Sequence, residues 1–233
     1  MRKLLSSAVF ALMFIAALGT TPSWASASRP DEVLRTWNQL VLELVRHTPT
    51  YSPPVASRSF AYLGVTAFEA VASGSPEMQS LAGQLNGLTP APQREAGKTY
   101  DEAVVLQAAL AFAAQNFFEN TGPTGQRALA SLEAKLRTKA TAGLPADVAV
   151  RSEDYGRAVA KHILAWSQDD GGAVIENMGF PLQYELTKGA ANWVPTGLAA
   201  QQQTPLLPNW GKNRTFAMPS GATCDLPPPP SYS

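Results

Sequence analysis

Few residues of this sequence have the types and spacing that catalysis or metal binding requires. Its two histidines, His47 and His162, belong to no HExxH-type pair, and no acidic cluster supplies the carboxylates of a metal-binding triad. The sequence also contains no GxSxG nucleophile elbow, no phosphate-binding loop and no dinucleotide-binding glycine motif. We therefore predict no catalytic, cofactor-binding or metal-binding residue in this chain.

Each histidine has a catalytic and a structural interpretation, and we favour the structural one. His47 falls where a predicted helix ends, and a cation there interacts favourably with the helix dipole. His162 falls beside the apolar stripe of another predicted helix. A hydrogen-bonded histidine in the core or at its edge is expected at such a position.

Glu69 is the carboxylate of greatest chemical interest, because it falls within a strongly apolar helical stretch. A buried carboxylate needs a partner or a raised pKa. Arg58 shares its helix face but lies about three turns away, roughly 16 Å along the axis, which is too far for a direct pair. We expect a cation from another helix to form a structural ion pair with Glu69. The alternative is a catalytic acid.

Two further groups of residues resemble ligand sites. The run Asp169–Gly172 (DDGG) looks like a fragment of a calcium loop, but the further ligands of such a loop are missing, so we predict capping and a turn. Trp193, Trp210, Lys212 and Arg214 alternate aromatic and basic side chains as a binding patch would. Anchoring of an extended arm explains the same residues, and we favour it.

The stretch from Tyr51 to Gly74 gives the strongest helix prediction, and we expect it to be the central, buried helix of the fold. Proline is tolerated in a first helical turn, so Pro53 and Pro54 mark the start. The end is predicted at Gly74, because glycine can adopt the left-handed conformation that terminates helices. Its apolar side chains cover most of the circumference in two stripes, Phe60, Leu63, Ala67 and Val71, and Ala56, Val65, Phe68 and Ala72.

Helical periodicity and terminal signals predict four more helices. They cover 32–47, with Asp31 as the N-cap, 99–120, 124–142 and 152–170, the last with Glu153 and Asp154 favourably placed in its first turn. Proline and glycine break the periodicity of 75–99, which we expect to be an irregular segment attached to the core through Leu81, Leu85 and Leu88. The fold class is therefore all-α.

The chain divides into three predicted segments. Residues 1–27 have the layout of a secretory signal peptide, with basic residues, a short apolar run and small residues before a cleavage site after Ala27. A membrane anchor is the alternative, but the run is shorter than the roughly 20 apolar residues that span a bilayer. Residues 28–175 form a bundle of about five helices, and 176–233 form a Pro- and Gly-rich extended arm without a core of its own. We thus expect an exported protein, periplasmic or secreted.

Charge and cysteine content exclude several classes of partner. The predicted signal peptide holds two of the 18 basic residues and none of the 18 acidic ones, so the mature chain has a formal charge of −2. No basic patch stands out, which argues against nucleic acid and, after signal cleavage, against a membrane as the main partner. Cys224 is the single cysteine, so an internal disulfide is excluded.

Seven short stretches form an ordered set along the mature chain. They are 52–58 (SPPVASR), 61–65 (AYLGV), 81–88 (LAGQLNGL), 166–171 (WSQDDG), 193–196 (WVPT), 208–216 (PNWGKNRTF) and 227–230 (PPPP). Together they resemble the N-terminal half of bacterial vanadium-dependent haloperoxidase-like proteins, in the type 2 phosphatidic acid phosphatase superfamily. The resemblance extends over essentially the whole mature chain.

The resemblance implies an α-helical protein whose first helices shield a second helical bundle. In the family, that second bundle holds vanadate or a substrate phosphate with a lysine, arginines, a Ser-Gly-His stretch and a further histidine, since an oxyanion needs several fixed cationic donors. Here Ser73-Gly74 is followed by Ser75, and Ser220-Gly221 by Ala222, so neither supplies the Ser-Gly-His stretch. We therefore expect the catalytic C-terminal helical domain to be absent, and vanadate to be bound only in full-length relatives.

These observations favour a truncated or split haloperoxidase-like or acid phosphatase-like exported protein, which provides the N-terminal helical scaffold and is inactive alone. The alternative is a helical interaction module that docks onto a separately encoded catalytic half. A third interpretation is an independent hydrolase that uses Glu69 and a histidine. The expected partners are a C-terminal catalytic half or a second copy of the chain. Whether the family chemistry is halide oxidation or phosphate ester hydrolysis stays open, because the discriminating pocket is missing.

Overall fold

A computed structural model describes residues 28–189, 191–198 and 201–219. The predicted signal peptide, Cys224 and the 227–230 proline run lie outside these ranges. Five α-helices follow one another as α1 (Pro30–Arg46), α2 (Pro53–Ala72), α3 (Glu102–Phe117), α4 (Gly122–Thr141) and α5 (Ala146–Ser167). Three short 3-10 helices are η1 (Glu119–Thr121), η2 (Asn177–Gly179) and η3 (Trp210–Lys212), and the described ranges contain no strand. The all-α prediction with five helices is confirmed.

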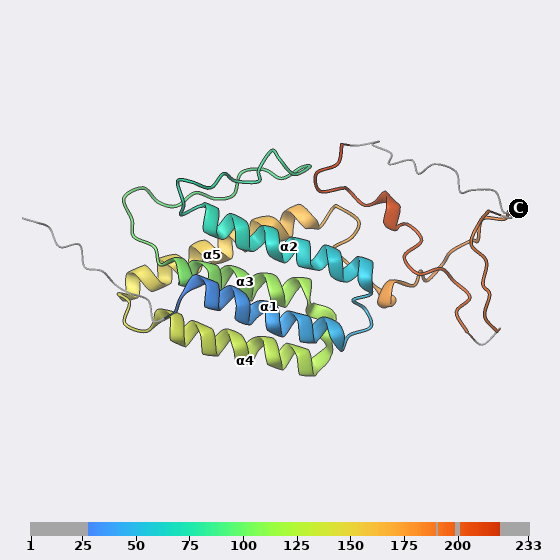
Figure 1. The fold of residues 1–233 in the computed structure, drawn as a ribbon, viewed down its shortest axis with the longest axis horizontal. Coiled ribbons are helices and arrows are strands. Elements are labelled where there is room, and N and C mark those ends of the chain that lie inside the picture. Colours follow the sequence, from blue (N-terminus) through green and yellow to red (C-terminus); the bar gives the residue numbers. More distant parts are fainter. Residues whose placement is uncertain (1–27, 190, 199–200, 220–233) are drawn as a thin grey trace, which may run out of the picture.

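The central helix is α3, not α2. Twelve of the sixteen residues of α3 are buried, and α3 packs against α1, α2, α4 and α5 (Figure 1). The expectation that the stretch Tyr51–Gly74 is central was therefore wrong, since α2 packs mainly against α3 and α5 and exposes Ser57 and Gly64. The alanines of α3 explain the difference, because small side chains let neighbouring helices approach from every side.

The contact between α3 and α5 depends on a glycine. A Cβ on Gly156 would lie 2.2 Å from the carbonyl oxygen of Val105 and 3.0 Å from the Cβ of Ala108. Glycine and alanine at these positions therefore let the two helix backbones come unusually close. The same contact buries Val159 and Ile163 of α5 completely.

Two helices begin at other residues than predicted. Helix α1 starts at Pro30, and Asp31 does not cap it but forms ion pairs with Arg29 at 3.0 Å and Arg35 at 2.9 Å. Helix α5 starts at Ala146, six residues before the predicted start at Ser152. A proline at N1 is favourable in α1 because its missing N–H would have no helical acceptor there.

The residues predicted to open α5 instead join it to its neighbours. The Ser152 hydroxyl accepts a hydrogen bond from the backbone N–H of Asp101, at 2.9 Å. Glu153 pairs with Arg137 of α4 at 2.7 Å. The predicted dipole role of Glu153 was therefore wrong, because it lies in the second turn of the helix and has a cationic partner. Asp101 caps α3, since its carboxylate accepts the N–H of Val104 at 3.0 Å.

Helix α2 starts at Pro53 as predicted, but its end differs from the prediction. The residue after the helix, Ser73, has right-handed backbone angles, and Gly74 has no positive φ. A Cβ on Gly74 would lie 2.6 Å from the Arg94 guanidinium and from the Glu102 carboxylate. Glycine thus leaves space here for the Arg94–Glu102 ion pair and does not form a left-handed turn.

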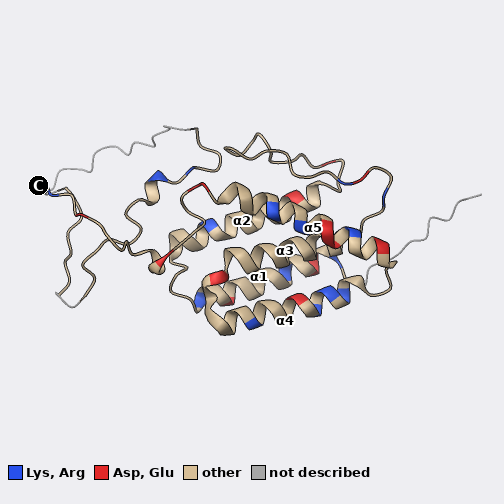
Figure 2. Ribbon diagram, turned by 180° about the vertical axis from the view of Figure 1, so that it is seen from behind, with Lys and Arg blue, Asp and Glu red and all other residues tan. Residues whose placement is uncertain are grey.

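The segment between α2 and α3 and the arm after α5 are irregular, as predicted. Between α2 and α3 the chain forms turns, with Leu88 buried in the core and Leu81 and Leu85 packed against it. After α5 the described residues contain only the two short 3-10 helices η2 and η3, and the arm extends beyond the end of the bundle (Figure 1). Charged residues are spread over the helices and are sparse on the arm (Figure 2). None of the described helices is long and apolar enough to cross a membrane.

Candidate functional site

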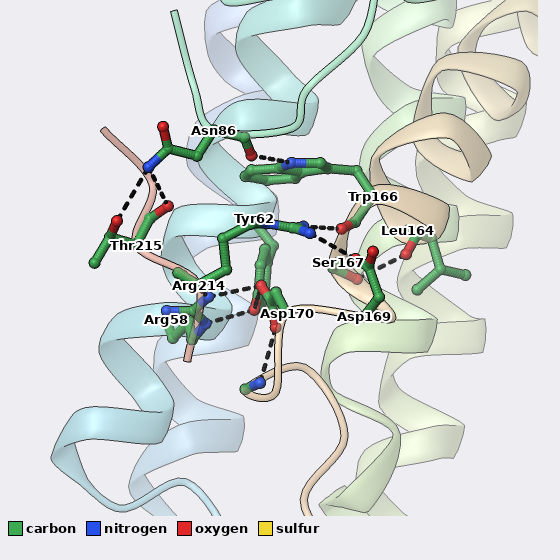
Figure 3. A network of polar contacts seen from close by, with 11 residues as sticks. Arg58, Tyr62, Asn86, Leu164, Trp166, Ser167, Asp169, Asp170, Arg214 and Thr215 are labelled. Atoms are coloured by element: carbon green, nitrogen blue, oxygen red, sulfur yellow. Dashed lines mark hydrogen bonds and ion pairs between the residues drawn. The ribbon is translucent and has the colours of Figure 1, made fainter. Parts of the chain in front are cut away.

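A polar cluster joins α2, the end of α5 and the arm (Figure 3). Its members are Arg58, Tyr62, Asp169, Asp170 and Arg214. The Arg58 guanidinium donates hydrogen bonds to Asp170 Oδ2 at 2.7 Å, to the backbone carbonyl of Arg214 at 2.6 Å and to the Tyr62 hydroxyl at 2.6 Å. The Asp170 side chain is fully buried and that of Arg58 is 12% exposed. The ion pair is therefore internal.

The predicted turn at Asp169–Gly172 is present and shapes the cluster. Asp170 Oδ1 accepts the backbone N–H of Gly172 at 2.8 Å, which is the local pattern of an Asx-turn. Gly171 has φ +83°, a conformation that favours glycine, and a Cβ on Gly172 would lie 2.5 Å from Arg58 Cδ. The two glycines thus make the turn and leave room for the arginine.

Hydrogen bonding and burial set the protonation of the cluster. The Tyr62 hydroxyl donates to Asp170 Oδ2, and burial together with this hydrogen bond to Asp170 raises the pKa of Tyr62. Burial alone would lower the pKa of Arg58. Its hydrogen bonds to Asp170 and Tyr62 outweigh burial, so the pKa of Arg58 is raised above its ordinary value. The cluster therefore favours a protonated phenol and a charged guanidinium.

Arg214 fastens the arm to the end of α5. Its backbone N–H donates to the Asp170 carbonyl at 2.8 Å. Its guanidinium pairs with Asp169 at 2.7 Å and donates to the Trp166 carbonyl. Asn86, from the segment between α2 and α3, donates to the carbonyls of Thr215 at 3.0 Å and Met218 at 2.7 Å. The chain from 214 to 218 is thus fixed from two sides.

Aromatic side chains enclose the same region. Phe216 is stacked on Trp166 with ring centroids 5.3 Å apart and meets Tyr62 edge-on at 5.4 Å. The Arg58 guanidinium lies 4.7 Å from the centroid of Phe216. The cluster is therefore closed to solvent on the aromatic side.

The anchoring role predicted for the arm's aromatic and basic residues is confirmed in part. Arg214 joins the polar cluster, and Trp210 packs against the hydrophobic core. Trp193 is 43% exposed, and Lys212 is exposed as well. These two residues do not anchor the arm.

Glu69 is buried as expected, but its predicted partner was wrong. Its carboxylate accepts hydrogen bonds from the Ser80 hydroxyl at 2.8 Å and from the backbone N–H of Leu81 at 2.6 Å. Among the described residues no cation forms an ion pair with it. Neutral donors from the following turn satisfy the carboxylate, so Glu69 fixes the connection after α2.

The two histidines lie apart from the polar cluster. His47 follows the last residue of α1, and its Nε2 lies 3.5 Å from the Glu43 carboxylate at the surface. His162 lies on α5 and its Nε2–H donates to the carbonyl of Thr89 at 2.8 Å. Both positions agree with the structural interpretation, and neither histidine hydrogen-bonds to Glu69.

The polar cluster does not fit vanadate. An oxyanion site needs several fixed cationic donors that are free to bind the ligand. The two arginines of the polar cluster instead point at Asp169, Asp170 and backbone carbonyls, and the cluster contains no histidine. In the same ranges no group of three His, Cys, Asp or Glu residues could hold a metal ion. The contacts of the cluster therefore stabilise the fold.

Sequence reasoning missed the pairing of Arg58 with Asp170. The two residues are 112 positions apart, and no local pattern indicates that they meet. One signal was available, because Arg58, Tyr62, Asn86, Asp170 and Arg214 lie in five different stretches of the ordered set that carries the family resemblance. These stretches converge at one place in the fold, where they hold the arm against the bundle.

The bundle and this internal cluster define a helical protein, and a comparison with solved structures shows that its fold is haloperoxidase-like. A solved structure, described as that of the first bacterial vanadium-dependent iodoperoxidase, is similar with a TM-score of 0.68 and 31% sequence identity. The similarity covers 87% of this chain and 46% of the iodoperoxidase chain, so this chain spans less than half of that protein. No protein-family model and no curated protein matches the sequence.

Proposed function

We propose that this chain provides the N-terminal helical scaffold of an exported vanadium-dependent haloperoxidase-like or acid phosphatase-like protein, and that it is inactive alone. The observation that carries the proposal is the similarity to the iodoperoxidase, which extends over 87% of this chain but only 46% of the other. A second helical half then supplies the lysine, the arginines and the histidines of the oxyanion site. This chain supplies the surface that covers that half.

The polar cluster supports this role. Burying an ion pair costs desolvation free energy. Such a pair can nevertheless serve the protein by fixing one arrangement of the chain. Here it fixes three elements that are distant in sequence, namely α2, the end of α5 and the arm at Arg214. In our proposal the cluster positions residues for contact with the second half and takes no part in the reaction.

The second half is encoded either in the same reading frame or by a separate gene. In the second case this chain is a helical interaction module that docks onto a separate catalytic protein. The two arrangements share the same contact surface, so one structural argument supports both. They differ in the gene order that they predict.

The first test is to read the DNA that follows the codon for Ser233. We expect a continuation in frame or after a frameshift, or an adjacent gene, that encodes a lysine–arginine stretch and Ser-Gly-His. The chain alone should then show no vanadate-dependent iodide oxidation with hydrogen peroxide and no phosphate ester hydrolysis, and the complete protein should show one of them. A locus without those motifs, or either activity from the chain alone, would overturn the proposal.

A further inference from the structure

A long segment projects from the end of the bundle and is closed at its base. We call the described residues 173–189, 191–198 and 201–206 the projecting segment. At its base the backbone N–H of Arg214 donates to the carbonyl of Asp170, and Arg58 donates both to the Asp170 carboxylate and to the carbonyl of Arg214. These bonds close a loop of about forty residues at a fixed neck, and the loop extends away from the helices (Figure 1). Such closed surface loops are frequently functional.

The projecting segment carries most of the large apolar side chains that are exposed in the described chain. Of thirteen large apolar side chains that are exposed, nine lie in it, and three lie on the helices of the bundle. Leu182 is 82% exposed and Leu198 is 76% exposed. The described part of the segment contains just three charged residues, Glu176, Glu185 and Lys188. This density of exposed apolar side chains favours a surface that another molecule covers.

A groove runs along the base of this segment. Its volume is about 450 Å³, within the range of roughly 300–1,000 Å³ of ligand-sized sites. Its lining includes apolar side chains from two stretches, Val174, Ile175, Phe180, Leu182, Leu207 and Trp210, beside the polar Glu176, Asn177, Asn209 and Asn213. The backbone N–H of Leu207 donates to the carbonyl of Gly179 at 2.9 Å, which holds the two stretches together. The groove can therefore receive an apolar side chain of a partner.

We propose that the projecting segment and its groove are the surface on which the second helical half docks. This inference rests on the proposed function and names the face of the scaffold that it uses. More than half of the iodoperoxidase chain lies outside the similarity, and the proposed function assigns that part to a large second half. A nearly uncharged, apolar face fits the apolar side of such a helical body better than it fits a nucleic acid or a charged ligand. Because the neck fixes the base of the loop, less conformational entropy is lost on docking.

Site-specific photo-crosslinking tests the contact in the protein with its second half, as the locus encodes it. The crosslinking residue p-benzoylphenylalanine replaces Leu182 or Leu198, which are exposed and therefore tolerate the change. The matched controls carry it in place of Leu42 or Val150, which are 56% and 57% exposed on the bundle. We expect crosslinks from 182 and 198 to peptides of the second half, and crosslinks from 42 and 150 to be at least about tenfold weaker.

The outcomes separate this inference from the proposed function. Crosslinks to the second half from 42 or 150, with none from 182 and 198, would overturn the inference and leave the proposed function standing. The absence of any second half at the locus would overturn both. A membrane is the competing partner for an apolar surface. Flotation of the chain with phosphatidylglycerol vesicles, lost in a Leu182→Asp and Leu198→Asp double variant, would also overturn the inference.

Discussion

The Arg58 guanidinium pairs with the Asp170 carboxylate at 2.7 Å across 112 positions of sequence, and the same guanidinium holds the Arg214 carbonyl at 2.6 Å. One side chain of α2 therefore fixes both the turn after α5 and the arm at Arg214. In the wider protein that we propose, this pair sets where the projecting segment leaves the bundle. Its loss should affect stability and the position of the arm together.

Removing the cation should be strongly destabilising. Arg58→Ala leaves the fully buried Asp170 carboxylate without its ionic partner, and breaking a buried pair in this way costs about 3–5 kcal/mol. Arg35→Ala is the matched control, because Arg35 and Asp31 are 66% and 51% exposed and such a pair contributes less than about 1 kcal/mol. Urea unfolding measures both. Limited proteolysis should also cut between 172 and 214 faster in Arg58→Ala, and equal losses in the two variants would contradict the internal role of the pair.

Two glycine substitutions in helices should change the free energy of unfolding in opposite directions. Gly156→Ala places a Cβ 2.2 Å from the carbonyl oxygen of Val105, so α3 and α5 must separate, at a cost of about 1–3 kcal/mol. Gly64→Ala on α2 meets nothing within 4 Å and should stabilise the helix by about 0.5–1 kcal/mol. Thermal unfolding of the two variants beside the wild type checks this. A stabilised Gly156→Ala variant would show that the α3–α5 contact is looser than described.

Substitutions of Glu69 separate a structural role from a catalytic one. Glu69→Ala leaves the Ser80 hydroxyl and the Leu81 N–H without their acceptor, which costs about 1–3 kcal/mol. Glu69→Gln keeps a carbonyl oxygen for the Leu81 N–H and should lose less stability. Urea unfolding gives both values. Hydrolase activity in the wild type that Glu69→Gln abolishes without loss of stability would instead make Glu69 a catalytic acid.

Alkaline pH should destabilise the fold partly through Tyr62. Burial raises the pKa of Tyr62 above its ordinary value of about 10, so the folded state keeps the phenol protonated after the unfolded state has ionised. Its contribution to stability is complete below about pH 10 and is lost as the pH rises toward the raised folded value. Tyr62→Phe cannot ionise, so its unfolding free energy should fall less steeply above pH 10 than that of the wild type. Burial also raises the pKa of Tyr51. The unfolding free energy of both proteins should therefore still fall to some extent above pH 10. Identical slopes would rule out a titrating Tyr62.

The helices were predictable because their signals are local. Prolines 53 and 54 fix the start of α2, and the apolar periodicity that follows defines its length. The start of α5 was placed six residues late because Ser152 looks like a helix cap. In the structure this serine accepts the N–H of Asp101 from another element. Local signals thus gave the number of helices correctly and some of their ends incorrectly.

The candidate site was much less predictable. The burial of Glu69 followed from its apolar neighbours, but its partners, Ser80 and Leu81, belong to a turn whose path no periodicity describes. The turn at Asp169–Gly172 was recognised, whereas its bond to Arg58 was not. A turn depends on four neighbouring residues, and an ion pair depends on how whole helices pack.

The sequence by itself determined that this chain is a helical bundle with an arm, because helix propensity, proline and glycine act within a few residues of one another. The sequence also contains the ordered series of stretches that carries the family resemblance. The tertiary structure alone decided that α3 is central, that Arg58 meets Asp170 and that the arm closes at Arg214. These relations join residues far apart in the chain, and they are set by the packing of all five helices at once.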